Sequence, residues 1–246
     1  MDATIVNIAF PNIAHSFQGS TIASLSWVLN AYNIVFAAFL VAAGRLADLL
    51  GRRRTFVFGL ELFTAASILC AFAPSVGLLV AFRVVQALGA AALVPSSLAL
   101  VLHAFPADRR THGVALLSAV AAAAAGLGPS LGGLLVAAWN WRLVFLVNVP
   151  IGIAAVLLAR RQLVESRTPG RRRMPDLFGA LLFALAIAAL VLGVVKGQEW
   201  GWTSARVLGA FAAALVLGAV TVAAAPLFTL RRLHRIDVPS TLRVAE

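Results

Sequence analysis

The sequence GRLADLLGRRR, residues 44–54, separates two long apolar runs, residues 27–43 and 55–73. Each run is about as long as the roughly 20 helical residues that cross a hydrocarbon core. Three consecutive arginines cannot lie in hydrocarbon, and the positive-inside rule places them on the cytoplasmic side of a membrane. We therefore predict two membrane helices joined by a tight cytoplasmic connection, in an all-α integral membrane protein.

Asp48 is the residue of this connection that is hardest to explain, because a single acid among leucines and an alanine needs a partner. Gly44 and Gly51 lie on either side of it. The first allows close backbone approach, and the second can end a helix. The alternative is a solvated basic loop, which explains the arginines alone.

The composition excludes an ordinary soluble domain, since 61% of the residues are hydrophobic and only 12% are charged. A net charge of +11 would suit a nucleic-acid partner, but the basic residues cluster in the gaps between apolar runs. We therefore expect a lipid bilayer as partner and no nucleic acid. Cys70 is the single cysteine, so the sequence predicts neither a disulfide framework nor a metal site. The excess of arginine and alanine suggests a bacterial source.

Eight apolar runs define the predicted organisation. We predict a six-span bundle over residues 1–162, a basic linker over 163–174, two additional transmembrane helices over 175–228 and a basic tail over 229–246. The first run, residues 1–16, covers only about 24 Å of a roughly 30 Å core. We therefore expect the first span to be truncated, or the start codon to be misplaced.

The charge distribution predicts the orientation of the chain. Of the 20 basic residues, 16 lie in the gaps after the second, fourth, sixth and eighth runs. The opposite gaps hold only Arg142, Lys196 and Arg206. By the positive-inside rule, both ends of the chain are cytoplasmic.

Two ionisable residues lie inside apolar runs. Arg83 must face protein or water, because an arginine at the centre of a membrane helix costs at least about 2.5 kcal/mol. Gln86 lies one turn further on the same side, and Gly89 follows it. The alternative for Arg83 is a side chain that snorkels to the outer interface. For Glu61 the alternatives are a carboxylate facing a water-filled cavity and a protonated acid.

Small residues dominate the fifth run. Gly128 and Gly132 form a Gly-x-x-x-Gly step that lets helix backbones touch, and Pro129 introduces a bend. Gly126 and Gly133 complete the pattern. A generic packing face is the alternative interpretation.

Four motifs together resemble the major facilitator superfamily, and within it the fourteen-span drug:proton antiporters of the EmrB/QacA type. Residues 44–54 resemble the loop signature between the second and third spans, and Arg83-x-x-Gln86-x-x-Gly89 resembles the fourth-span motif. Residues 126–133 resemble the fifth-span antiporter motif, and residues 143–152 the segment that follows it. A fifth motif resembles that of the first span at Asp2, Thr4, Asn7 and Pro11; for Asp2 the alternative is a solvated residue at the start of the chain.

The resemblance implies the N-terminal six-helix bundle of a facilitator, followed by two extra helices. It implies proton coupling through Arg83 and Asp2, to which we add Glu61 although it matches no family residue. A conformational switch is expected at the predicted loop, through Gly44, Asp48, Gly51, Arg52 and Arg53.

The implied function is proton-driven export of drugs or other hydrophobic or cationic small molecules across the cytoplasmic membrane. A proton gradient supplies the energy and no cofactor is expected, while a separately encoded C-terminal half is an expected partner. The alternative is a non-transporting fragment or an assembly partner of a split transporter. We expect no enzyme, because paired carboxylates, a nucleophile triad and a metal cluster are absent from the sequence.

Overall fold

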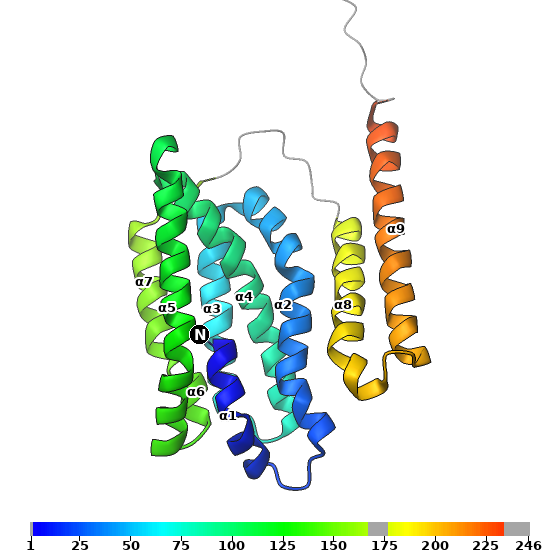
Figure 1. Ribbon diagram of the computed structural model, residues 1–246. Helices are drawn as coiled ribbons and strands as arrows, with labels where there is room; N and C mark the ends of the chain where they lie inside the picture. The colour runs from blue at the N-terminus through cyan, green and yellow to red at the C-terminus, as the bar shows by residue number, and fades with distance from the viewer. Residues whose placement is uncertain (1, 167–176, 234–246) are drawn as a thin grey trace, which may run out of the picture. The chain divides into compact units, whose positions relative to one another are not determined.

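The computed structural model describes residues 2–166 and 177–233. The chain divides into two compact units, residues 1–175 and 176–246, which we describe separately. Both are built from helices, and the described residues contain no strand (Figure 1). The first unit holds α1 (Asp2–Ser16), α2 (Ile22–Leu50), α3 (Arg52–Ala71), α4 (Val76–Ala104), the 3-10 helix η1 (Ala107–Arg109), α5 (Arg110–Ala138), α6 (Arg142–Leu146) and α7 (Asn148–Gln162).

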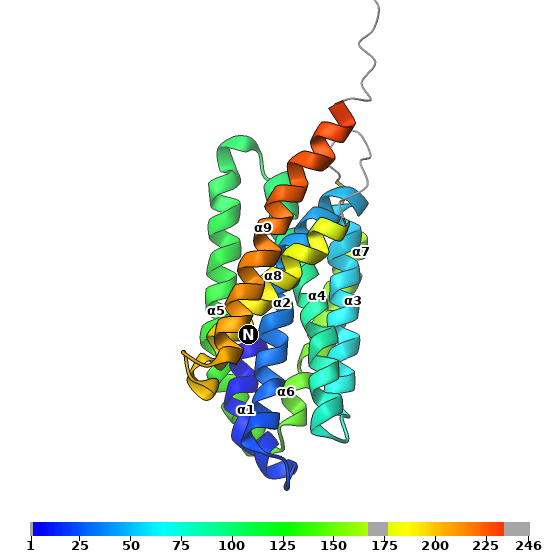
Figure 2. The same ribbon diagram turned by 90° about the vertical axis from the view of Figure 1, so that its right-hand side faces the viewer.

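Helix α4 is central to the first unit, because it packs against α2, α3 and α5 (Figures 1 and 2). A Cβ added at Gly89 would lie 2.7 Å from the backbone nitrogen of Phe63 and 2.9 Å from the backbone oxygen of Gly59. The backbones of α3 and α4 therefore touch at this point, and Gly89 of the fourth-span motif serves helix packing. Local sequence also starts α4, since the hydroxyl of Ser75 accepts a hydrogen bond from the Leu78 N–H at 3.3 Å.

Seven helical segments of the described residues are long and apolar enough to cross a membrane. Helix α1 is not among them, since it has 15 residues. Large apolar side chains also cover the outside of the first unit; Leu116, Val120 and Leu134 on α5 are each at least 60% exposed. Such a surface suits lipid as the surrounding solvent.

The predicted loop at residues 44–54 is almost entirely helical. Helix α2 continues through Leu50 and α3 begins at Arg52, so Gly51 alone separates them. Gly51 has a φ of +115°, a backbone conformation that favours glycine, and its N–H still donates to the Ala47 oxygen at 3.0 Å. Polar residues therefore continue both helices, and the change from apolar to polar sequence does not mark where a helix ends.

The second unit contains α8 (Leu177–Trp200) and α9 (Ala205–Leu233), which pack against each other. A Cβ added at Gly193 would meet the Phe211 ring at 2.7 Å, so these helices approach closely. Lys196, which the charge count placed in a gap between apolar runs, lies within α8, so here too the helix continues past the first charged residue. Residues 167–176 and 234–246, within the predicted linker and tail, lie outside the described residues.

Candidate functional site

Asp2 and Arg83 form a buried ion pair inside the first unit. Asp2 begins α1, and Arg83 lies on α4. Arg83 Nη1 donates to Asp2 Oδ2 at 2.6 Å, and the two side chains are 1% and 8% exposed, respectively. A charge left alone in such a place is costly, so each side chain makes the burial of the other possible.

The rest of the Arg83 guanidinium is also surrounded by protein. Its Nε donates to the backbone oxygen of Val28 at 3.3 Å, and Nη1 donates to Gln86 Oε1 at 2.6 Å. The guanidinium carbon lies 3.9 Å from the centre of the Tyr32 ring, which is a cation–π distance. Arg83 therefore faces protein and does not snorkel to an interface.

Gln86 connects the ion pair to α3. Its Nε2 donates to Asp2 Oδ1 at 3.2 Å and to Ser67 Oγ at 2.7 Å, and Ser67 in turn donates to the Phe63 oxygen. The Cys70 thiol lies 3.9 Å from Gln86 Oε1. Gln86 is fully buried, so these bonds satisfy an amide that water does not reach.

Asn148, the first residue of α7, completes the site. Its Nδ2 donates to Asp2 Oδ1 at 3.1 Å. We use the name Arg83 cluster for six residues from five helices: Asp2, Tyr32, Ser67, Arg83, Gln86 and Asn148.

Sequence reasoning identified Asp2, Arg83 and Gln86 but assigned no role to the other three members of the cluster. Ser67, Tyr32 and Asn148 are polar residues within or beside apolar runs, and this is the signal that could have found them. The other residues of the first-span motif differ in exposure. Asn7 and Pro11 are exposed on α1 and Thr4 is half-buried; the contacts described for the Arg83 cluster do not include them.

Helix α1, which carries Asp2, rests on the glycines of the fifth span. Gly128 and Gly132 are buried, and a Cβ added at Gly132 would lie 3.1 Å from Ile5 Cγ2 on α1. A Cβ at Gly126 or Gly133 would meet nothing within 4 Å, and Pro129 is exposed. The motif thus has one face that packs against α1 and one face open to its surroundings.

A second charged region lies where α2 meets α3. The carboxylate of Glu165 accepts hydrogen bonds from the N–H of Arg53 at 3.2 Å and of Arg54 at 3.3 Å. These are backbone donors of the first turn of α3, so Glu165 caps that helix from a segment more than 100 residues away. A Cβ at Gly51 would lie 2.5 Å from Glu165 Oε1. We call Gly51, Arg53, Arg54 and Glu165 the Glu165 cap.

The other predicted switch residues lie beside this cap. Asp48 pairs with Arg52 Nη2 at 3.0 Å across the Gly51 connection. Gly44 packs on α4, where a Cβ would lie 3.3 Å from Pro95. The structure therefore brings the five residues of the predicted loop together at one end of the bundle.

Glu61 belongs to this second region and not to the Arg83 cluster. Its carboxylate accepts a hydrogen bond from Arg160 on α7, and the two side chains are 40% and 60% exposed. Arg53 Nη2 also donates to the Arg160 backbone oxygen, at 2.6 Å. Glu61 therefore has an ion-pair partner, which neither sequence alternative had included.

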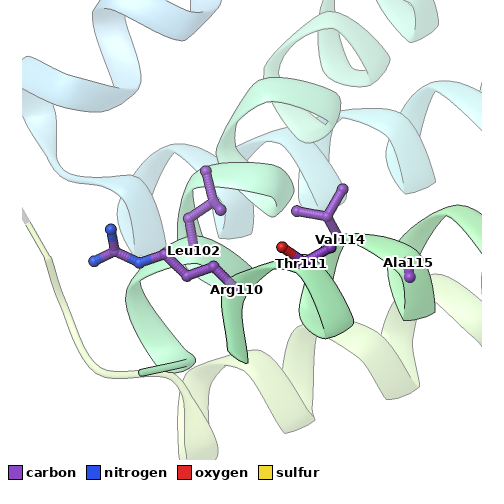
Figure 3. A pocket seen from close by; sticks show the side chains of 5 residues that line it. All are labelled: Leu102, Arg110, Thr111, Val114 and Ala115. Atoms are coloured by element: carbon purple, nitrogen blue, oxygen red, sulfur yellow. The ribbon is translucent and has the colours of Figure 1, made fainter. Parts of the chain in front are cut away.

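A groove of about 410 Å³ opens between α4 and α5 (Figure 3). Leu102 of α4 lines it together with Arg110, Thr111, Val114 and Ala115 from the first turns of α5. The lining is mostly apolar and shares no residue with the Arg83 cluster. Among the described residues, no group of three or more histidines, cysteines or acids could hold a metal ion.

The membrane-spanning helices and the buried ion pair between them are features of a multi-pass membrane transporter. The sequence profile of the Major Facilitator Superfamily matches residues 1–175, and the chain belongs to this family. This confirms the resemblance to the superfamily that the sequence motifs indicated.

Relatives in two bacteria are resistance proteins. The chain is 44% identical over 209 residues to the multidrug resistance protein Stp of Mycobacterium tuberculosis, covering 85% of this chain and 38% of that protein. It is 38% identical over 240 residues to the methylenomycin A resistance protein of Streptomyces coelicolor, covering 97% of this chain and 48% of that protein. The chain thus spans less than half the length of these relatives.

A solved structure supports the fold. A crystal structure of the peptide transporter POT superposes with a TM-score of 0.53 and 20% sequence identity, covering 84% of this chain and 44% of that chain.

Proposed function

We propose that this chain supplies the N-terminal portion of a proton-coupled exporter of hydrophobic or cationic small molecules. The observation that carries the proposal is the Arg83 cluster. It holds a carboxylate against a guanidinium among membrane-spanning helices, and such intramembrane acids are the groups that proton relays use. The names of Stp and of the methylenomycin A resistance protein support drug-like substrates.

In this proposal Asp2 carries the proton and Arg83 responds to it. While Asp2 is ionised, the ion pair ties α1 to α4. A protonated Asp2 no longer neutralises Arg83, so the guanidinium is free to change partners or to meet a carboxylate elsewhere. Proton binding is thereby converted into a change in helix contacts, which alternating access requires.

The Glu165 cap and the Asp48–Arg52 pair are proposed as a state-dependent contact at the cytoplasmic face, with both ends of the chain cytoplasmic. Glu61 is proposed to support this contact through Arg160 rather than to carry a proton. Because the relatives are about twice as long, we also propose that transport needs a second half of the carrier as a partner.

A dye-transport assay in lipid vesicles tests the proposed function. The chain, alone and together with any separately encoded C-terminal half, is reconstituted with an imposed pH gradient and a fluorescent cationic dye. Dye movement should require the gradient, fall to background in Asp2→Asn and Arg83→Ala, and persist in the control Arg109→Ala, whose side chain is 74% exposed. Gradient-driven dye movement by Asp2→Asn at the normal rate would refute the role of Asp2.

A further inference from the structure

The carboxylate of Asp2 accepts hydrogen bonds from three donors. Oδ2 accepts from Arg83, and Oδ1 accepts from Gln86 Nε2 at 3.2 Å and from Asn148 Nδ2 at 3.1 Å. A carboxylate only accepts hydrogen bonds, whereas a carboxylic acid carries an O–H that needs an acceptor. The cluster therefore fits ionised Asp2, and a protonated Asp2 needs one neighbour to change from donor to acceptor.

Two of the three neighbours are poorly suited to this change. Arg83 has donors and no acceptor. Gln86 could present Oε1 to Asp2 only by breaking its 2.6 Å bond with Arg83 and its 2.7 Å bond with Ser67. A reversed Gln86 would also turn its Nε2 donor toward Arg83 Nη1, which is itself a donor.

Asn148 is free of these restrictions. Asp2 is the one hydrogen-bond partner that the structure gives for its side chain among residues 2–166 and 177–233. Asn148 is half-buried, so protein does not cover it completely. Rotation of the amide by half a turn about its last side-chain bond replaces Nδ2 with Oδ1 at the same position.

Because Asn148 begins α7, its rotation affects how α7 is joined to α1. Asn148 begins α7, directly after the break at Val147 that separates α7 from α6. Its bond to Asp2 therefore joins the start of α7 to the start of α1. If the Asn148 amide can reverse, its hydrogen bond joins these two helix ends whether Asp2 is ionised or protonated.

We propose that Asn148 is a positioning residue that follows the protonation of Asp2 by reversing its amide; this proposal rests on the proposed role of Asp2 in proton coupling. A hydronium ion transfers its proton to Asp2 Oδ1: one O–H bond of the hydronium breaks, the O–H bond of the carboxylic acid forms, and water is left. The hydrogen bond from Asn148 Nδ2 to Asp2 Oδ1 is replaced by one from the new Asp2 O–H to Asn148 Oδ1.

Other groups near Asp2 do not compete in an acidic titration. Among the described residues, the charged or titratable side chains around it are Arg83 on α4, Tyr32 on α2 and Cys70 on α3. Arginine keeps its charge, and tyrosine and cysteine stay neutral in acid.

Infrared difference spectroscopy tests the proposal on the full 246-residue chain in lipid vesicles, without requiring transport. Spectra at neutral and acidic pH are compared for protein with unlabelled asparagine and with asparagine labelled with carbon-13 in the side-chain amide. Acidification should produce a carboxylic acid band that Asp2→Asn abolishes. A label-sensitive amide carbonyl band should shift at the same pH, and this shift should be lost in both Asp2→Asn and Asn148→Leu.

The control is Asn33→Leu, because Asn33 is an exposed asparagine of α2; both signals should persist in it. If Asn148→Leu does not fold, Asn148→Gln replaces it, because it keeps a side-chain amide but removes the labelled asparagine at this position; the label-sensitive shift should then be lost. An Asp2 carboxylic acid band without an amide shift would overturn the reversal of Asn148 and leave proton coupling standing. The absence of that carboxylic acid band at every pH would overturn both proposals.

Discussion

The Arg83 cluster and the Glu165 cap both pair an acid with an arginine, but they differ in burial. The Asp2 and Arg83 side chains are 8% and 1% exposed, whereas Glu165 and Arg54 are 26% and 69% exposed. The partners also differ in kind. Arg83 donates to a carboxylate of α1, a backbone carbonyl of α2 and an amide of its own helix. Glu165 mainly accepts hydrogen bonds from backbone N–H groups at the start of α3.

Burial, and not the pairing itself, decides how much each contact contributes to stability. A buried pair leaves an uncompensated charge when one partner is removed. An exposed pair is screened by water and salt, so its loss has a small effect. The comparison therefore predicts how variants rank by the loss of unfolding free energy, and measurements on those variants can contradict this ranking.

The largest effect is expected for removal of one buried partner. Arg83→Ala should destabilise the chain by about 3–5 kcal/mol, because the Asp2 carboxylate stays buried without its cation. Equilibrium unfolding in detergent measures the change. Arg109→Ala, which removes an exposed arginine, should shift stability by less than about 1 kcal/mol; equal effects from the two variants would contradict the comparison.

A double substitution sharpens the same point. Asp2→Leu combined with Arg83→Met should cost clearly less than the sum of the two single changes, because no unpaired charge is left in the bundle. A double-mutant cycle of the unfolding free energies measures the coupling. Additive single effects would mean that the 2.6 Å contact contributes nothing specific.

Gly51→Ala is expected to have an intermediate effect. The backbone at φ +115° is strained for any residue with a Cβ, and that Cβ would also press on the Glu165 carboxylate at 2.5 Å. We expect a loss of about 1–3 kcal/mol. Gly77→Ala is the matched control, because a Cβ there meets nothing within 4 Å and the change should be neutral or stabilising.

The smallest effects are expected for Glu165 and Asp48, two acids that are more exposed than Asp2. Glu165→Ala removes a helix cap and should cost about 0.5–2 kcal/mol. Asp48→Asn weakens a pair that is 22% and 50% exposed and should cost less than about 1 kcal/mol. Unfolding in low and high salt measures both, and an Asp48→Asn effect that exceeds that of Arg83→Ala would reverse the proposed order.

The sequence by itself determined the class of fold. Its continuous apolar runs are about as long as membrane-spanning helices, which satisfy every backbone hydrogen bond within the segment where lipid offers none. Helical spacing also placed Arg83 and Gln86 on one side of α4, where the structure shows them bonded at 2.6 Å. The helix end at Gly51 follows equally from local backbone preference.

Only the tertiary structure decided which polar groups meet. Asn148 reaches Asp2 across 146 positions of sequence, Arg160 reaches Glu61 across 99, and Glu165 reaches Arg53 across 112. Hydropathy reports how each residue interacts with its solvent and its near neighbours, and it is silent on which helices pack together. Small-residue contacts set that packing, such as Gly89 against Phe63 and Gly132 against Ile5, and with it the partners that Arg83 finds on other helices.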